Sequence, residues 1–168
     1  MTTRTRIAQI FLWLSVISIS IYIGGTVFSM SVIVPMWNAS PPESVRAFFL
    51  GTQFNRTIGN FFGPPFMISR YLPLWVCLIA GWHLKTHRKY FLLTVVCFTF
   101  GVAFTLFYIY PINAVLFAQA GGSHSAEEIR QMAHQWVLAD RVRFAVSSVG
   151  FLSLLRALSI PFPARDHV

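Results

Sequence analysis

The sequence predicts an all-α membrane protein, an antiparallel bundle of four transmembrane helices, and three observations point to this class. Of the 168 residues, 55% are hydrophobic and only 11% are charged, whereas about 25% of an average soluble domain is charged. Two segments, residues 7–42 and 90–126, contain no Lys, Arg, Asp or Glu. Uncharged apolar runs of about 18 residues or more are typical of membrane-spanning helices. We therefore expect a single membrane domain over residues 1–168.

The first transmembrane helix is expected at about residues 7–35. Its apolar run is longer than the hydrophobic core of a cleavable signal, about 7–15 residues, so we interpret it as a retained helix. Small side chains at Gly24, Gly25 and Ser29 allow another helix to approach closely. Pro35 marks the far end of this helix at the membrane interface.

The remaining three helices are expected at about residues 66–84, 90–118 and 126–160. The last begins at Ser125-Ala126-Glu127-Glu128, the spacing of a capping box, in which the Ser and Glu side chains satisfy free backbone N–H groups. In the long connection that precedes the second helix, Phe54, Ile58 and Phe61 recur at helical spacing. That pattern predicts a short helix lying in the membrane interface.

Basic residues predict the orientation, because Lys and Arg accumulate in cytoplasmic loops. In the four-helix arrangement, one side carries Arg4, Arg6, Lys85, Arg88, Lys89, Arg156 and Arg165, and the other carries Arg46, Arg56 and Arg130. Both termini are therefore expected in the cytoplasm, in a plasma membrane or a bacterial inner membrane. The net charge of +8 reflects this topology and contacts with lipid headgroups, so nucleic acid is not an expected partner.

Two of the four expected spans contain charged side chains. Between Arg70 and Lys85 lie residues 71–84, about 21 Å of helix against a hydrocarbon core of about 30 Å. The fourth span contains Asp140, Arg141 and Arg143. A charge at mid-membrane costs about 2.5–3.5 kcal/mol on insertion scales, so these groups are expected to lie near an edge, to pair, or to face a wet cavity.

Helical spacing sorts the polar residues of the fourth span into two stripes. Trp136, Asp140 and Arg143 share one stripe, and His134 and Arg141 fall on another. Asp140 and Arg143 can therefore pair and point the same way. An ordinary interfacial Trp with snorkelling Arg side chains gives the same pattern, and this alternative stays open.

The third span offers polar partners at the same depth. Pro111 cannot donate to the carbonyl of Phe107, so that carbonyl is available to a side chain, water or ligand. Asn113 adds two donors and an acceptor, although an Asn in a span often only bonds a neighbouring helix. Together with Arg70 and the stripe of the fourth helix, these residues predict a pocket at the outer end of the bundle.

Other polar groups are interpreted as structural. Cys77 and Cys97 lie in apolar segments without a CxxC or metal-ligand spacing, and we expect two small buried residues. His83 and His87 are four residues apart, but no carboxylate or thiol accompanies them. No metal site is therefore predicted.

Three short motifs carry a family resemblance. They are Tyr22-Ile-Gly-Gly25 followed by Pro35, Tyr110-Pro111-Ile112-Asn113, and Trp136-x3-Asp140-x2-Arg143. By these motifs and the order of its helices, the chain resembles the anthrone-oxygenase-like family of small four-span membrane proteins, most of which have no assigned function. The family pattern more usually has Asn or His at the position of Asp140.

The resemblance implies oxidation of an anthrone by molecular oxygen without a bound organic cofactor. Asp140 or His134 would then be the base, Arg143 and Asn113 would stabilise the anion, and Trp136 would be a stacking wall. From the residues alone we rank first a cationic pocket for a small anionic, aromatic or lipid-like ligand. Arg70, Arg141 and Arg143 against Asp140 sum to +2, which favours an anionic partner. The oxygenase is the alternative function, and a structural or assembly subunit is the third. Self-association is left open.

Overall fold

The computed structural model of this chain describes residues 2–50, 61–118 and 124–163. Within these residues every regular element is helical, which confirms the expected all-α class. The elements are α1 (Thr3–Phe28), η1 (Ser29–Ile33), α2 (Val34–Trp37), α3 (Glu43–Leu50), α5 (Pro64–Ala80), α6 (Lys85–Phe104), η2 (Thr105–Ile109), α7 (Tyr110–Asn113), η3 (Ala114–Ala118) and α8 (Ala126–Leu158). The three η segments are π-helical turns, so the helical path runs without a break over residues 3–37 and 85–118.

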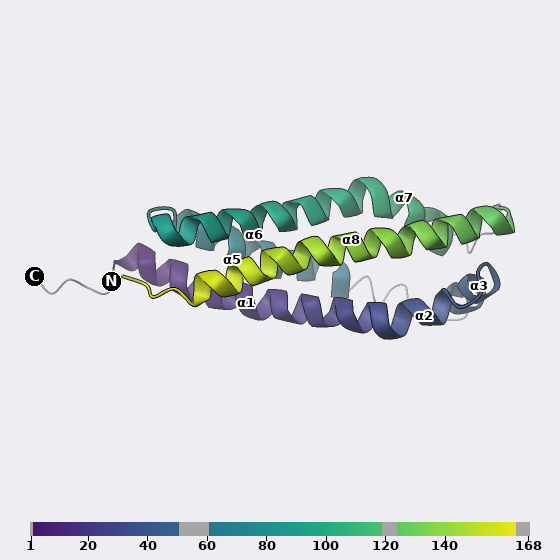
Figure 1. Cartoon of the computed structure of the whole chain (residues 1–168), viewed down its shortest axis with the longest axis horizontal. Coiled ribbons are helices and arrows are strands. Elements are labelled where there is room, and N and C mark those ends of the chain that lie inside the picture. Colours follow the sequence, from purple (N-terminus) through teal and green to yellow (C-terminus); the bar gives the residue numbers. More distant parts are fainter. Residues whose placement is uncertain (1, 51–60, 119–123, 164–168) are drawn as a thin grey trace, which may run out of the picture.

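The long helices lie side by side along the long axis of the molecule (Figure 1). α1 packs against α5 and α8, and α6 packs against the same two helices. The start of α1, the start of α6 and the end of α8 lie together at one end, and α2, α3 and the start of α8 lie at the other (Figure 1). α5 is short and accompanies α1 and α6 over only part of their length, while α3 contacts α2 and η3 at the opposite end.

The buried apolar side chains form two separate clusters. The first combines α1, α5, α6 and the end of α8 and includes Leu12, Ile19, Leu74, Cys77, Phe91, Phe98 and Leu154. The second lies where α2, α3, η2 to η3 and the start of α8 meet and includes Trp37, Val45, Ile109, Leu116, Ile129 and Trp136. Members of both clusters, together with polar side chains, line the site described below.

Two of the proline-containing helical paths widen into a π-turn just before a proline, whereas α5 holds Pro73 within an ordinary α-helix. Val34 N–H bonds the carbonyl of Ser29, immediately before Pro35, and Tyr110 N–H bonds that of Thr105, immediately before Pro111. Proline lacks an N–H and its ring crowds the carbonyl four residues back, so a wider turn accommodates it within a continuous helix. The expected interruption at Pro111 therefore takes the form of a π-turn at η2.

Within the described residues, two helices are long and apolar enough to cross a membrane, Thr3–Trp37 and Lys85–Phe117, and Phe66–Ala80 is a shorter apolar helix. Many large apolar side chains on these helices are exposed, among them Ile10, Ile17, Phe28, Ile68, Leu72, Ile79, Val96 and Phe107. Their exposure suggests association with a membrane. α8 is not among these helices, because it carries more charged residues than they do.

The helix boundaries differ from the expected ones at the turn between the second and third helices. α5 ends at Ala80, and Gly81, whose N–H bonds the Cys77 carbonyl, follows as its C-cap. α6 already begins at Lys85. Residues 85–89, which lie between the two expected helices, therefore belong to the start of α6. Of the expected interfacial helix, Phe54 and Ile58 lie outside the described residues, whereas Phe61 is helical and half-buried.

The two cysteines are free and buried, as expected of small core residues. The Cys77 thiol faces the Ala8 carbonyl on α1. Cys97 lies where α6 packs against α8, so close to Gly150 that a Cβ added to this glycine would lie only 2.9 Å from the Cβ of Cys97. His83 and His87 contact neighbouring segments near the start of α6. His83 Nε2 lies 3.1 Å from the Thr5 hydroxyl, and His87 Nε2 lies 3.2 Å from the Ile160 carbonyl oxygen.

Candidate functional site

A cavity of about 410 Å³ is lined by residues of both apolar clusters and by polar side chains. Its volume falls within the range of small-molecule pockets, about 300–1,000 Å³. Aromatic side chains make up much of its wall, namely Tyr22, Trp37, Phe49, Phe62, Tyr71, Phe98, Tyr110, Phe117 and Trp136. Its polar and charged lining comes from Arg70, Asn113, Asp140 and Arg143, with Thr26, Ser29, Thr105 and Ser147.

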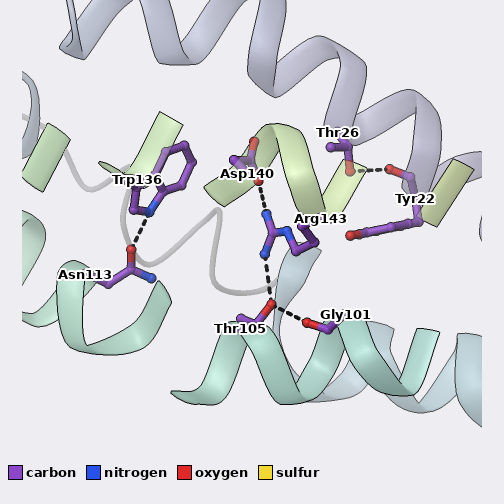
Figure 2. Close-up of polar contacts among 8 residues, drawn as sticks. All are labelled: Tyr22, Thr26, Gly101, Thr105, Asn113, Trp136, Asp140 and Arg143. Carbon is purple, nitrogen blue, oxygen red and sulfur yellow. Dashed lines mark hydrogen bonds and ion pairs between the residues drawn. The ribbon is translucent and has the colours of Figure 1, made fainter. Parts of the chain in front are cut away.

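Asp140 and Arg143 form a buried ion pair on α8. Their side chains are 3% and 15% exposed, and Arg143 Nη2 donates to Asp140 Oδ1. Arg143 Nη1 donates to the Thr105 hydroxyl at 3.3 Å, and that hydroxyl donates to the Gly101 carbonyl at 2.7 Å. Figure 2 shows the guanidinium of Arg143 between Asp140 and Thr105, so the pair is also joined to the neighbouring helical path.

Trp136 and Asn113 form a second polar contact in the cavity. The indole N–H of Trp136 donates to Asn113 Oδ1 at 2.6 Å (Figure 2). Indole nitrogen is only a donor, so this bond fixes the amide with its oxygen towards Trp136 and leaves the Nδ2 hydrogens for another acceptor. The Trp136 ring also packs edge-on against Trp37, with centroids 5.2 Å apart. Asn113 therefore holds a rigid aromatic wall and keeps a free donor.

Arg70, on α5, is the most isolated charge of the site. Only 5% of the residue is exposed, and its guanidinium carbon lies 4.2 Å from the centroid of the Tyr22 ring and 5.5 Å from that of Phe66. Its Nε and Nη1 atoms are buried without a hydrogen-bond partner, as is Nε of Arg143. The described residues thus leave cationic N–H groups unsatisfied at the cavity, which is costly in the absence of a ligand.

The helical path of α6 to η3 brings a row of residues to the cavity through its π-turns. Five lining residues, each four positions after the last, are Gly101, Thr105, Ile109, Asn113 and Phe117. In an ideal α-helix each four-residue step turns the side chain by about 40°, so the row would rotate away by about 160° over its length. η2 and η3 hold more residues per turn, and they keep the row on one side.

α8 reaches the same cavity with ordinary α-helical geometry. Trp136, Asp140, Arg143 and Ser147 follow steps of four, three and four residues, the spacing of one face. The expected stripe of Trp136, Asp140 and Arg143 and the expected neighbours Asn113 and Arg70 thus line one cavity. Their catalytic and binding roles stay predictions.

Three residues of the expected cluster do not line this cavity. His134 and Pro111 are exposed, His134 because it lies two positions, about 200°, from Trp136 on α8. Arg141 is exposed as well and borders a second hollow beside Asn38 and Pro35. The charges that line the cavity are therefore Arg70 and Arg143 against Asp140, a net charge of +1 instead of +2.

Sequence reasoning missed Tyr22 and Thr105 as functional candidates. Tyr22 lies in the Tyr-Ile-Gly-Gly motif, but an aromatic side chain in an apolar helix gives no sign that it faces an arginine. Thr105 could have been found from the four-residue repeat that contains Asn113 and ends at Phe117. That repeat is visible in the sequence once a wider turn is assumed before Pro111.

Comparison with protein families decides the relationship of this chain. The family model described as anthrone oxygenase matches residues 53–153, more than half of the chain. The chain belongs to the anthrone oxygenase family. For this anthrone oxygenase family member, comparisons with curated proteins and with solved structures found no match. The matched region contains Arg70, Asn113 and the α8 stripe, whereas the Tyr22 wall of the cavity comes from α1, which precedes it.

Proposed function

We propose that this protein is a membrane-embedded oxygenase that binds a flat phenolic substrate of the anthrone class in the 410 Å³ cavity. The observation that carries the proposal is the convergence of one carboxylate, two guanidinium groups and one amide between aromatic walls. The aromatic walls suit a planar polycyclic ligand, and the net positive charge suits a substrate that becomes an anion. Membership of the anthrone oxygenase family supports the same substrate class.

Asp140 is the proposed general base. Its carboxylate takes one proton from the acidic CH₂ carbon of the anthrone, and the electron pair of that C–H bond delocalises through the rings onto the carbonyl oxygen. Negative charge therefore moves from Asp140 to the substrate, while Arg143, already bonded to Asp140, remains beside both. A positioned base of this kind typically contributes about 10²–10⁴-fold to the rate.

Arg143 and Asn113 stabilise the oxyanion formed in this step. Arg143 supplies a fixed positive charge, and Asn113 supplies the Nδ2 hydrogens that its bond to Trp136 leaves free. Donors already in place before the charge develops need no reorganisation during the reaction, which is the main requirement for electrostatic stabilisation.

Molecular oxygen completes the reaction. The anion gives its electron pair to O₂ and forms a C–O bond, and protonation yields a hydroperoxide on the former CH₂ carbon. Loss of the second hydrogen as a proton, with cleavage of the O–O bond, releases water and leaves the new carbonyl. The balance is one anthrone plus one O₂ giving one anthraquinone plus one water. The protein's residues supply proton transfer and charge stabilisation, and O₂ is the oxidant.

The proposed setting is a bundle that crosses the membrane four times. α1 and the α6 path are long enough to span, and α5 exposes Ile68, Leu72, Trp75 and Ile79. α8 directs Asp140 and Arg143 to the cavity and exposes Leu138, Val142, Val149 and Leu152. A helix that hides its charges and exposes apolar residues is compatible with lipid. The basic residues favour a cytoplasmic location for both termini.

A binding protein without turnover is the second candidate, and a lipid-like or anionic aromatic ligand would occupy the same cavity. The unpartnered N–H groups of Arg70 favour some form of anion binding whether or not turnover occurs. A purely structural role for the cluster is less well supported, because a subunit that only pins helices together has no need of a cavity.

Oxidation of 1,8-dihydroxyanthrone by the purified protein in detergent tests the oxygenase directly. Quinone absorbance and oxygen consumption should rise together, one to one, above the rate of protein-free autoxidation. Arg143→Gln should lower the rate by about 10²-fold or more. The matched control is Arg88→Gln, because Arg88 also lies on an aromatic ring, 5.0 Å from Trp82, but does not line the cavity. A wild-type rate equal to autoxidation would refute the oxygenase.

A further inference from the structure

Arg70 is buried and charged, yet no acidic group of the described residues neutralises it. The residue is 5% exposed, and it lines the cavity. The ion pairs among the described residues are His124–Glu128, Arg130–Glu127 and Arg143–Asp140, and none of them includes Arg70. An arginine does not lose its charge at any ordinary pH, so this cation remains beside the cavity at all times.

The aromatic rings around Arg70 satisfy only part of its requirements. Tyr22 and Phe66 attract the positive charge through their ring faces, at 4.2 and 5.5 Å. They offer no carboxylate or carbonyl oxygen to the N–H groups, and Nε and Nη1 remain without a partner. The rings therefore position the guanidinium, while its hydrogen bonds are left for something that enters the cavity.

We propose that Arg70 binds a carboxylate on the aromatic substrate, so that the substrate class of the cavity is an anthrone-type aromatic carboxylic acid. The inference deepens the proposed function and rests on it for the aromatic skeleton. A guanidinium presents two parallel N–H groups that match the two oxygens of a carboxylate, which makes the contact both strong and directional.

The charges of the cavity fit a singly charged ligand. Arg70 and Arg143 against Asp140 leave a net charge of +1 among the ionised residues that line it, and one carboxylate cancels this charge. Proton transfer from the substrate to Asp140 then moves charge within the cavity without changing the total. Arg70 would hold the carboxylate while Arg143 and Asn113 remain available to the reacting oxygen.

Paired probes test this assignment without requiring turnover. Anthraquinone-2-carboxylate and anthraquinone-2-carboxamide share the ring system and differ in charge, and their dissociation constants can be measured by quenching of tryptophan fluorescence in detergent. Wild type should bind the carboxylate about tenfold or more tightly than the carboxamide. Arg70→Gln should lose this preference and keep its affinity for the carboxamide. Arg70→Lys should keep only part of the preference, because Lys lacks the planar fork.

Arg88→Gln is the matched control and should retain the full preference of wild type. Equal affinity of wild type for the two probes would overturn the proposal, as would equal weakening of both probes by Arg70→Gln, which would mean that Arg70 only shapes the cavity. A short-chain phosphatidic acid that reverses the quenching by anthraquinone-2-carboxylate, with a lower dissociation constant than that probe, would also overturn the proposal and would assign the oxyanion site to a lipid phosphate.

The outcomes separate this inference from the proposed function. 1,8-Dihydroxyanthrone carries no carboxylate, so its oxidation does not depend on the Arg70 contact for charge. Preference for the carboxylate without turnover would retain the inference and reject the oxygenase. Turnover of 1,8-dihydroxyanthrone without a preference for the carboxylate probe would retain the oxygenase and reject the role inferred for Arg70. If Arg70→Gln fails to fold, the two probes on wild type and the Arg70→Lys variant still decide the matter.

Discussion

The Asp140–Arg143 pair allows a quantitative prediction, because both partners are buried within one site. Their side chains are 3% and 15% exposed, so a charge that loses its partner is left largely out of bulk water. Removing one member of a buried pair typically costs about 3–5 kcal/mol, since the other charge is left uncompensated. We therefore expect Asp140→Ala and Arg143→Met each to lower the free energy of unfolding by about that amount.

The double variant Asp140→Ala with Arg143→Met should lose less free energy of unfolding than the two single variants lose in sum. It should lose less than either single variant if the cavity closes around the methionine. This follows because no uncompensated charge remains. The assay is reversible unfolding in mixed detergent micelles, followed by far-UV circular dichroism, for wild type, both single variants and the double variant. Single substitutions that change stability by less than about 0.5 kcal/mol would refute the reasoning, because exposed pairs behave in that way.

Three further predictions concern the second polar contact, the topology and the start of α8. Asn113→Leu should lower stability by about 1–3 kcal/mol in the same unfolding assay, because it leaves the nearly buried indole N–H of Trp136 without an acceptor; adding Trp136→Phe should recover much of the loss. A cysteine at Ser123, in a chain whose native cysteines are replaced, should react with an impermeant maleimide in intact cells, and labelling only after lysis would reverse the topology. Hydrogen bonds from the Ser125 backbone N–H and hydroxyl hold the pKa of Glu128 below its usual range. The cap should therefore be fully stabilising above the unfolded glutamate pKa of about 4.3 and be lost as the pH falls through the lowered folded value. Hydrogen exchange at the first turn of α8 should show this loss in wild type and little pH dependence in Glu128→Gln, whose amide can accept the same hydrogen bonds but does not titrate.

The sequence is most informative for α8, because that helix is regular. Ser125 and Glu128 form the expected capping box at its start, and simple 100° steps place Trp136, Asp140 and Arg143 on the cavity. The same steps show why His134 faces away. Charge patterning likewise indicates where the long apolar helices lie, since segments without charged residues coincide with α1 and with the α6 path.

The sequence is less informative where the helices widen. Regular α-helical steps do not predict that Gly101, Thr105 and Asn113 share one face, because the π-turn η2 changes the phase of the helix before Asn113. Proline signals a local disturbance, but whether it kinks, breaks or widens the helix depends on tertiary packing. The position of Arg70 between Tyr22 and Phe66 is also a tertiary result, since α5 must pack against α1 to create it.

Exchange of the acidic CH₂ hydrogens of 1,8-dihydroxyanthrone with solvent deuterium, measured by NMR under nitrogen, tests the central claim most directly. It isolates the proton transfer assigned to Asp140 from any reaction with oxygen. Wild type should accelerate exchange above the protein-free rate, and Asp140→Asn, which keeps the shape of the side chain, should lose about 10²–10⁴-fold of that acceleration. Exchange at the protein-free rate in wild type, or equal acceleration by wild type and a folded Asp140→Asn variant, would contradict the account.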